Sequence, residues 1–487
     1  MSDDDRAQLE AKIAGLQEQI AAQAVEIDRL TRLSVELTRR LEKGSKNSSS
    51  PPSADSPKHQ AEATKTRAER RAEVKAKRKD EVERNRGKQP GAPGQNLAMR
   101  SVPDGEPVAH EPSCCVSCGE DLAGAPVEGF ERRQVFDTPN PVIIDPEHRS
   151  IRRRCSCGTL NKGVFPREAT APTSYGPNIR AAALYLLHGQ HLSVERTAEA
   201  MSAMLGAPVS TGFVASLANQ AAGGLDGFVE ELRRRLRGAA LVHVDETSDQ
   251  VRTHKWWFHV VSNELFTYLF ASPTRGKAAP DEAGVLGVFG GVMVHDRLAM
   301  YFKYDQATHA ICGSHLLRDL AAVGVGWDQG WANDMAALLT EMNNAAHGAR
   351  AKDKAQLSRR VLAGFLTRYD TLTTAGLAAN PQPVGRDRDY IERDGYNLVT
   401  ALITLKTEAT RFATDLDVPF SNNEAERALR MAKLHKKISG CFQSDEGARS
   451  FATIRSYLAT ARKHNVGALD VLAHLFRGDA WMPPVTT

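Results

Sequence analysis

The hydrophobic pattern of the chain begins with a long helical repeat near the N-terminus. Apolar side chains recur at alternating spacings of four and three residues from Leu9 to Leu41, the period of a coiled-coil seam. Gln23 and Ser34 place polar side chains in this seam, which favours a dimer of modest stability. An amphipathic helix packed on its own body is the alternative, but the Ser/Pro-rich segment that follows supplies no nearby core. We therefore expect a coiled coil over residues 1–43, which would pair subunits into a homodimer or a larger assembly.

Strand-like patterns appear in the middle of the chain. The four expected strands cover residues 241–245, 255–261, 265–270 and 291–296. Short turns join the first three, which predicts consecutive antiparallel strands, and a helical segment around 279–289 precedes the fourth. Three meandering strands, a helix and a further strand follow one another in a ribonuclease-H-like α/β core. We assign this core to residues 238–320 and 417–476.

Residues 171–237 are expected to be helical and to resemble a helix-turn-helix. A helical pattern at 193–204, then Gly206, then a second helical pattern at 210–219 fits this motif, whose second helix would enter a groove of DNA. An ordinary helical hairpin fits equally well, because the second helix carries no Lys or Arg.

The segment between the second strand-end acid and the last helices is too long for a loop. It combines a long polar helix pattern at 333–372, a Gly/Pro/Asn-rich loop at 376–387 and another helix at 393–415. We assign residues 321–416 to a helical insertion domain inside the core, which would contact DNA ends or a partner subunit. The fold class expected for the whole chain is therefore multidomain α+β.

Length, composition and charge are consistent with this domain organisation. The 487 residues suffice for roughly three domains, and the hydrophobic fraction of 41% suffices for real cores. The net charge is only +4, so the placement of charge matters more than its total. Residues 44–99 are assigned to a basic flexible linker, and its charged part at 58–88 is either a solvated helix or a non-specific DNA-binding arm. The polar start and the lack of a long apolar run predict a cytoplasmic protein with no membrane partner.

Two cysteine doublets predict a small zinc-binding β module at residues 100–170. The four thiols belong to Cys115, Cys118, Cys155 and Cys157. Each doublet is followed by Gly, which suits a tight turn after a metal-bound thiolate, and four thiolates close a tetrahedral site for one structural Zn²⁺. The second doublet is C-x-C rather than C-x2-C, and Cys114 competes with Cys115 as a ligand. Reduced, buried cysteines are the alternative.

Three acidic residues are candidates for a catalytic metal site. Asp245 and Asp296 each end an apolar strand, and Glu426 lies near the start of a helix that follows an extended segment. In the ribonuclease-H-like order, the two Asp would occupy neighbouring strands with the Glu on a helix beside them. Three converging carboxylates repel one another unless cations neutralise them, which predicts a metal-dependent site. Two Mg²⁺ (or Mn²⁺) ions held by such a set suit phosphodiester cleavage and transfer.

Glu424 is the rival to Glu426 as the third acid. The two residues lie about 200° apart around a helix, so both cannot face one site. The face of Glu424 continues through Ala428 and Met431, which is typical of packing. The face of Glu426 continues through three bases, Arg430, Lys433 and Lys437. Because bases beside a carboxylate suit a metal site on a phosphate backbone, we favour Glu426.

Several neighbours of these acids read as structural. Ser421, Asn422 and Asn423 are good N-cap residues, so a capped surface helix is an alternative for the segment that holds Glu426. Cys312 and His315 have metal-like spacing on a helix, but no second doublet lies nearby, and we interpret them as a structural pair beside the site. The further acids, most of them expected at the surface or in turns, are Glu246, Asp249, Asp305 and Asp319.

Four stretches of the chain carry a family resemblance. They are Leu241-Val-His-Val-Asp-Glu-Thr, His295-Asp-Arg, His309-Ala-Ile-Cys-Gly-Ser-His-Leu-Leu-Arg318 and Pro419-Phe-Ser-Asn-Asn-Glu-Ala-Glu-Arg-Ala-Leu-Arg430. The chain resembles, over nearly its whole length, the DDE transposases of the IS66 insertion-sequence family. The family's acids map onto Asp245, Asp296 and Glu426. The departures are the shortened second cysteine doublet and Ser421, where the family often has Asp.

This resemblance implies a transposase that binds the ends of its mobile element as double-stranded DNA, cuts them with Mg²⁺ and joins the freed 3′-hydroxyl to target DNA. It would act on the nucleoid in the cytoplasm, and accessory proteins of the same element are further candidate partners. Two alternatives stay open: a metal-dependent nuclease that does not transfer strands, and a catalytically inactive DNA-binding regulator.

Overall fold

The computed structural model describes residues 23, 97–102, 104–166, 168–169, 171–326, 329–382 and 390–484. The coiled coil expected over residues 1–43 and the basic linker expected over 44–99 lie almost wholly outside these residues, so both stay predictions. The chain divides into two compact units, Met1–Gln60 with Ile143–Thr487 and Ala61–Val142, and each is described by itself.

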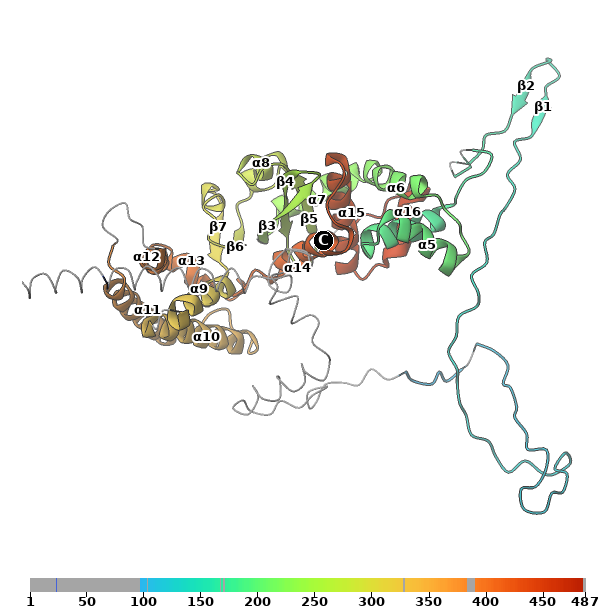
Figure 1. The fold of residues 1–487 in the computed structure, drawn as a ribbon, viewed down its shortest axis with the longest axis horizontal. Helices are drawn as coiled ribbons and strands as arrows, with labels where there is room; N and C mark the ends of the chain where they lie inside the picture. Colours follow the sequence, from blue (N-terminus) through green and yellow to red (C-terminus); the bar gives the residue numbers. More distant parts are fainter. Residues whose placement is uncertain are drawn as a thin grey trace, which may run out of the picture. The chain divides into compact units, whose positions relative to one another are not determined.

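A five-stranded mixed sheet organises the larger unit (Figure 1). Its strands are β3 (Leu241–Val251), β4 (His254–Ser262), β5 (Thr267–Ser272), β6 (Val292–His295) and β7 (Thr308–Ile311). The order across the sheet is β5-β4-β3-β6-β7, antiparallel from β5 to β3 and parallel from β3 to β7. The expected run of three antiparallel strands, with the fourth beside the first, is confirmed. The helix expected around 279–289 is shorter, with α8 at Ala278–Glu282 and a 3₁₀ turn, η4, at Leu286–Val288.

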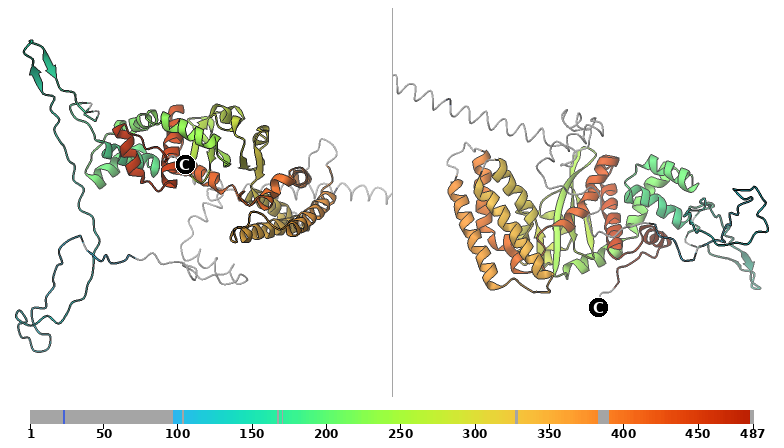
Figure 2. Two further views of the ribbon diagram at one scale, coloured as in Figure 1. Left: turned by 180° about the vertical axis from the view of Figure 1, so that it is seen from behind. Right: turned by 90° about the horizontal axis from the view of Figure 1, so that it is seen from below.

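Helices bury both faces of this sheet. The helices that contact it include α7 (Asp226–Arg237), α14 (Asn423–Ser439) and α15 (Asp445–Lys463). Successive residues of a strand point to opposite faces. Val242 of β3 accordingly shares a hydrophobic cluster with Leu232 of α7, whereas Val251 shares another with Leu429 of α14 and Phe451 of α15. Figure 2 shows α14 and α15 lying beside the sheet.

Helices also fill the segment expected to form a helix-turn-helix. The elements before the sheet are β1 (Arg152–Arg154), β2 (Leu160–Lys162), α4 (Pro177–Leu184), the π-helix η3 (Tyr185–Gly189), α5 (Val194–Leu205) and α6 (Thr211–Gly223). Ser193 and Ser210 cap α5 and α6 by accepting backbone hydrogen bonds, and Gly206 ends α5 with a φ of 62°. Because α6 buries Val214 and Leu217 and carries no base, its part in DNA contact stays a prediction. The last helix, α16, spans Ala468–Arg477.

Among the described residues, five helices separate β7 from α14. They are α9 (Gly313–Gly326), α10 (Gly330–Arg350), α11 (Arg359–Ala379), α12 (Tyr390–Thr404) and α13 (Lys406–Thr414). They share a hydrophobic cluster that includes Leu339, Tyr369 and Phe412, and Figure 1 shows them grouped beside the sheet. The single helix expected over 333–372 is wrong, because α10 ends and α11 starts anew with Ser358 as its N-cap. None of the described helices is long and apolar enough to cross a membrane.

Gly291→Ala is expected to destabilise the fold, because the backbone before β6 passes closely by the residues that precede β3. A Cβ at position 291 would lie 2.5 Å from the carbonyl oxygen of Ala240 and 2.6 Å from that of Ala239. Backbone oxygens of a paired strand cannot move aside, so we expect the free energy of unfolding to fall by about 2 kcal/mol or more. Gly290→Ala is the matched control, since its Cβ would meet nothing within 4 Å. Equal melting temperatures for the two variants would contradict this prediction.

Candidate active site

Asp245 lies inside β3, and Asp296 directly follows the neighbouring strand β6. The expectation that Asp245 ends its strand is wrong, because β3 continues to Val251. His243 of β3 pairs in parallel register with Val294 of β6, so the residue two positions further along each strand reaches the same level. Paired strands are about 4.8 Å apart, which makes the two Asp residues immediate neighbours. Burial, and then the negative charges of Glu246 and Asp296, raise the pKa of Asp245 to about 7.

Neither of these two carboxylates forms an ion pair with a basic side chain among the described residues. One oxygen of Asp245 accepts a hydrogen bond from the next backbone N–H, and one oxygen of Asp296 accepts from the N–H of Leu298, each at 2.8 Å. Burial, reinforced by the charge of Glu246, also raises the pKa of Asp296. The arginine beside them, Arg275, pairs with Glu246 instead, at 2.7 Å. Two adjacent, poorly solvated carboxylates of this kind are a fitting site for a cation.

The start of α14 is fixed to this edge of the sheet by Asn422, whose side chain is fully buried. Its Nδ2 donates to the carbonyl oxygen of Val244 at 2.8 Å, and its Oδ1 accepts from Nδ1 of His243 at 3.0 Å. Its backbone N–H donates to Sγ of Cys312 at 3.2 Å. The N-cap role expected for these asparagines is not what Asn422 does, since its side chain makes no capping hydrogen bond. It ties α14 to the strand that carries Asp245.

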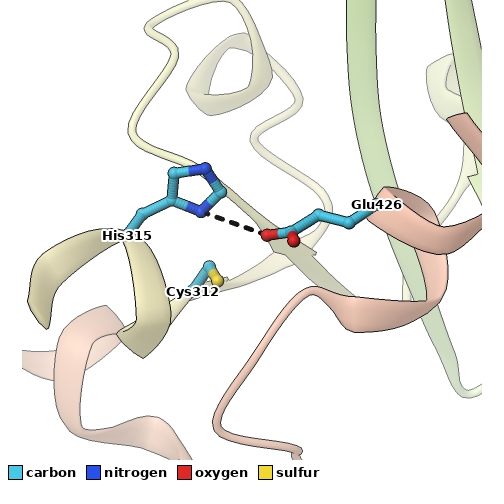
Figure 3. Close-up of side chains that lie close together, drawn as sticks. All are labelled: Cys312, His315 and Glu426. Carbon is cyan, nitrogen blue, oxygen red and sulfur yellow. Dashed lines mark ion pairs between the residues drawn. The ribbon is translucent and has the colours of Figure 1, made fainter. Parts of the chain in front are cut away.

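Glu426 lies one turn into α14 and faces Cys312 and His315, as Figure 3 shows. One ligand atom from each of these three side chains lies within 4.8 Å of the others. Nδ1 of His315 is 3.7 Å from Oε1 of Glu426. The charge of His315 also acts on Asp245 and Asp296, where it partly offsets the rise in pKa that burial causes. His315 therefore lies beside the predicted acids, as expected for the Cys312–His315 pair.

Glu424 makes different contacts from Glu426. Its carboxylate lies 3.3 Å from Nζ of Lys463 in α15 and 3.5 Å from Nη1 of Arg427 in its own helix. Ion pairs with two bases satisfy this carboxylate within the fold. Glu426, and not Glu424, thus lies beside Cys312 and His315, which follow β7.

Asp249, which was expected at the surface or in a turn, is instead buried. It belongs to β3, which continues to Val251, and its side chain is only 2% exposed. Its Oδ1 accepts from the N–H of Gln250 at 2.7 Å, and Nζ of Lys436 in α14 lies 4.0 Å away. The expectation was wrong because an acid after an apolar run usually marks the end of a strand. Here the strand continues, and α14 covers Asp249.

Asp249→Asn is expected to stabilise the protein near pH 8 but not near pH 4. Burial raises the pKa of Asp249 from 3.8 to about 6, so folding disfavours its ionised form. The resulting loss of folding free energy is absent below the pKa of Asp249 in the unfolded protein, where the carboxyl is protonated in both the folded and the unfolded state. It is complete above the pKa in the folded protein, where the carboxyl is ionised in both states. A shift of roughly two units corresponds to at most about 3 kcal/mol. Asn keeps the acceptor oxygen that Gln250 uses.

Urea unfolding at the two pH values measures this effect. Asp305→Asn is the control, because Asp305 is exposed and should give no pH-dependent gain. A stability difference between Asp249→Asn and the native protein that is the same at both pH values would show that ionisation is not its cause.

Each cysteine doublet forms the tight turn that its glycine predicts. The N–H of Gly119 donates to the carbonyl oxygen of Cys115, and that of Gly158 to the carbonyl oxygen of Cys155, each at 2.9 Å. Both glycines have positive φ, 77° and 90°, which disfavours any side chain. The second doublet lies in the turn between β1 and β2. The two doublets belong to different compact units, so the four-thiol zinc site stays a prediction.

Comparison with known protein families gives two matches. A family model described as "Transposase IS66 family" matches residues 172–450, more than half of the chain, and this span holds Asp245, Asp296 and Glu426. A second model, described as "Family of unknown function (DUF6444)", matches residues 2–98. No curated protein matches the chain.

Proposed function

The chain belongs to the IS66 family of transposases, and from this premise we propose that it cuts the ends of its insertion sequence and joins them to target DNA. The proposed site is a DDE set in a ribonuclease-H-like core, with Asp245, Asp296 and Glu426 as its three acids. The observation that carries this proposal is the pair of adjacent, half-buried carboxylates with raised pKa values, one inside β3 and the other directly after β6. Such a pair is unfavourable in a protein unless a cation binds there.

Divalent metal ions fit these residues. Mg²⁺ prefers carboxylate oxygens and keeps waters and substrate phosphates as its other ligands, which suits a set of three acids. Oε1 of Glu426 is buried and has no hydrogen-bond partner among the described residues, so it is free to bind an ion. We propose that the three acids hold two Mg²⁺ or Mn²⁺ ions. Such ions would activate the attacking oxygen and stabilise the leaving oxygen in phosphoryl transfer.

The protein's own groups would position these acids. Asn422 fixes the start of α14 against β3, and the backbone N–H groups of Glu246 and Leu298 each orient one carboxylate. Arg430 and Lys433 are exposed further along α14, where they suit the phosphate backbone of bound DNA. Catalysis would rest on positioning and charge neutralisation, with no protein nucleophile.

The remaining modules have proposed roles in DNA handling. Residues 1–43 would pair two subunits, since two element ends must be handled together. The basic linker at 44–99, the zinc module at 100–170 and the helices of 171–237 would contact the ends. The helical insertion at 321–416 would contact DNA or the second subunit, and the core would comprise 238–320 and 417–476.

A strand-transfer assay with pre-cut element ends tests the proposal. The native chain in Mg²⁺ is expected to join the 3′ end to a target duplex, and Asp245→Ala is expected to bind DNA alike without forming product. Asp305→Ala, which removes an exposed acid, is the control that should keep activity. Cleavage without joined product would favour a nuclease. Equal DNA binding by the native chain and Asp245→Ala, with no cleavage by either, would favour an inactive DNA-binding regulator.

A further inference from the structure

Three side chains of unlike chemistry converge beside the proposed catalytic acids. Cys312 supplies a thiol, His315 an imidazole and Glu426 a carboxylate, with ligand atoms within 4.8 Å of one another (Figure 3). Thiol and imidazole are poor ligands for Mg²⁺ but good ligands for Zn²⁺ and Co²⁺. This donor set therefore differs from the all-oxygen set proposed for catalysis.

The cluster also contains two unpartnered buried atoms. Nδ1 of His315 and Oε1 of Glu426 are both buried, and neither has a hydrogen-bond partner in the described part of the chain. Their separation of 3.7 Å is too long for a direct hydrogen bond. A buried polar atom left without a partner costs about 1–3 kcal/mol, so a ligand that contacts both would relieve a real penalty.

Hydrogen bonds with backbone groups fix the position of Cys312, the proposed sulfur ligand. The Cys312 side chain is fully buried, its N–H donates to the carbonyl oxygen of His295 at 2.8 Å, and its Sγ accepts from the N–H of Asn422 at 3.2 Å. Hydrogen bonds of this kind commonly support metal ligands. His315 lies in the first turn of α9, three residues on. Tetrahedral zinc ligands at about 2.0–2.3 Å from the ion lie roughly 3.4 Å apart, close to the His315–Glu426 separation.

We propose that Cys312, His315 and Glu426 bind one zinc-class ion, with a water or a substrate oxygen as the fourth ligand. The site does not depend on the proposed function. Only one consequence does: because Glu426 belongs to both donor sets, an ion held by Cys312 and His315 would compete with the catalytic ions for this carboxylate.

Cobalt binding by the full-length chain tests the proposal. Co²⁺ is added to the metal-free protein, and the bound ions per chain and the thiolate-to-cobalt absorption band are measured. The predicted zinc module also contains cysteines, so the result is a difference between variants. Cys312→Ser and His315→Gln are each expected to bind one ion fewer than the native chain. Cys441→Ser, which removes a cysteine outside the cluster, is expected to bind as many as the native chain.

The same number of ions bound by the native chain and by both cluster variants would overturn the proposal. Should Cys312→Ser fail to fold, His315→Gln decides, because its side chain is 27% exposed and tolerates the change better. Asp245→Asn separates this proposal from the catalytic one. It is expected to lose DNA cleavage and yet keep the ion, so either proposal can fail alone.

Discussion

Glu426→Gln is expected to lower DNA cleavage and joining by about a thousand-fold or more, whereas Glu424→Gln should keep both near the native level. Gln preserves the shape of the side chain but removes the charge that the proposed metal ions require. Metal-ion catalysis contributes several kcal/mol, and about 1.36 kcal/mol is a factor of ten in rate. Glu424 is a close control, because it lies on the same helix and is 26% exposed, against 27% for Glu426.

Single-turnover cleavage of a duplex that carries an element end measures both variants, and DNA affinity is measured separately. Glu424→Gln is expected to lose about 1 kcal/mol of stability, because Lys463 then lacks its carboxylate partner. Native activity in Glu426→Gln would show that Glu426 is not the third acid. A thousand-fold loss confined to Glu424→Gln would show that Glu424 is.

Asn422→Ala is expected to lower the free energy of unfolding by about 3 kcal/mol and to reduce DNA cleavage as well. The truncation leaves Nδ1 of His243 and the carbonyl oxygen of Val244 without the partners that Asn422 provides. Each buried group without a partner costs about 1–3 kcal/mol. The start of α14 would also lose its connection to the strand that carries Asp245, which explains the expected loss of activity.

Asn423→Ala is the matched control, since Asn423 is the adjacent residue, exposed on the first turn of α14. Its effect on unfolding should be within about 0.5 kcal/mol, as for most surface substitutions. Chemical unfolding of the two variants gives the comparison. If Asn422→Ala were no less stable than Asn423→Ala, the hydrogen bonds of Asn422 would not be what holds the helix to the sheet.

The order of the strands could be predicted from the sequence because apolar runs and short turns are local signals. β7 was not expected as a strand, since its four residues are too few to show a period of their own. The end of β3 was placed too early, because its second half mixes acids with apolar residues. Sequence alone does not show that these acids belong to a covered strand, because their burial depends on the packing of α14 against β3. The long helix expected over 333–372 failed for a related reason, since its break at Ser358 depends on packing within the insertion.

The candidate site was predictable in its parts but not in its contacts. Acids at the ends of apolar runs indicated Asp245 and Asp296, and the bases along one helix face favoured Glu426 over Glu424. These assignments stay predictions. Nothing in the sequence indicated that Asn422 bridges two distant segments, because a local capping role explains the same residue equally well. His315 was expected beside the site, but its separation of 3.7 Å from Glu426 depends on tertiary packing.

The hydrogen bonds of Asn422 to His243 and Val244 join residues 179 and 178 positions apart in the chain. Contacts of such long sequence separation are slow to form, because the long loop between the residues must be closed first. During synthesis on a ribosome, the sheet would emerge well before the helix that completes it. A polypeptide cut short by a frameshift or a stop codon inside the insertion helices would lack Glu426, and it would also lack α14 and α15, which cover one face of the sheet. We expect such fragments to be unable to break DNA, so that only fully translated copies can move the element.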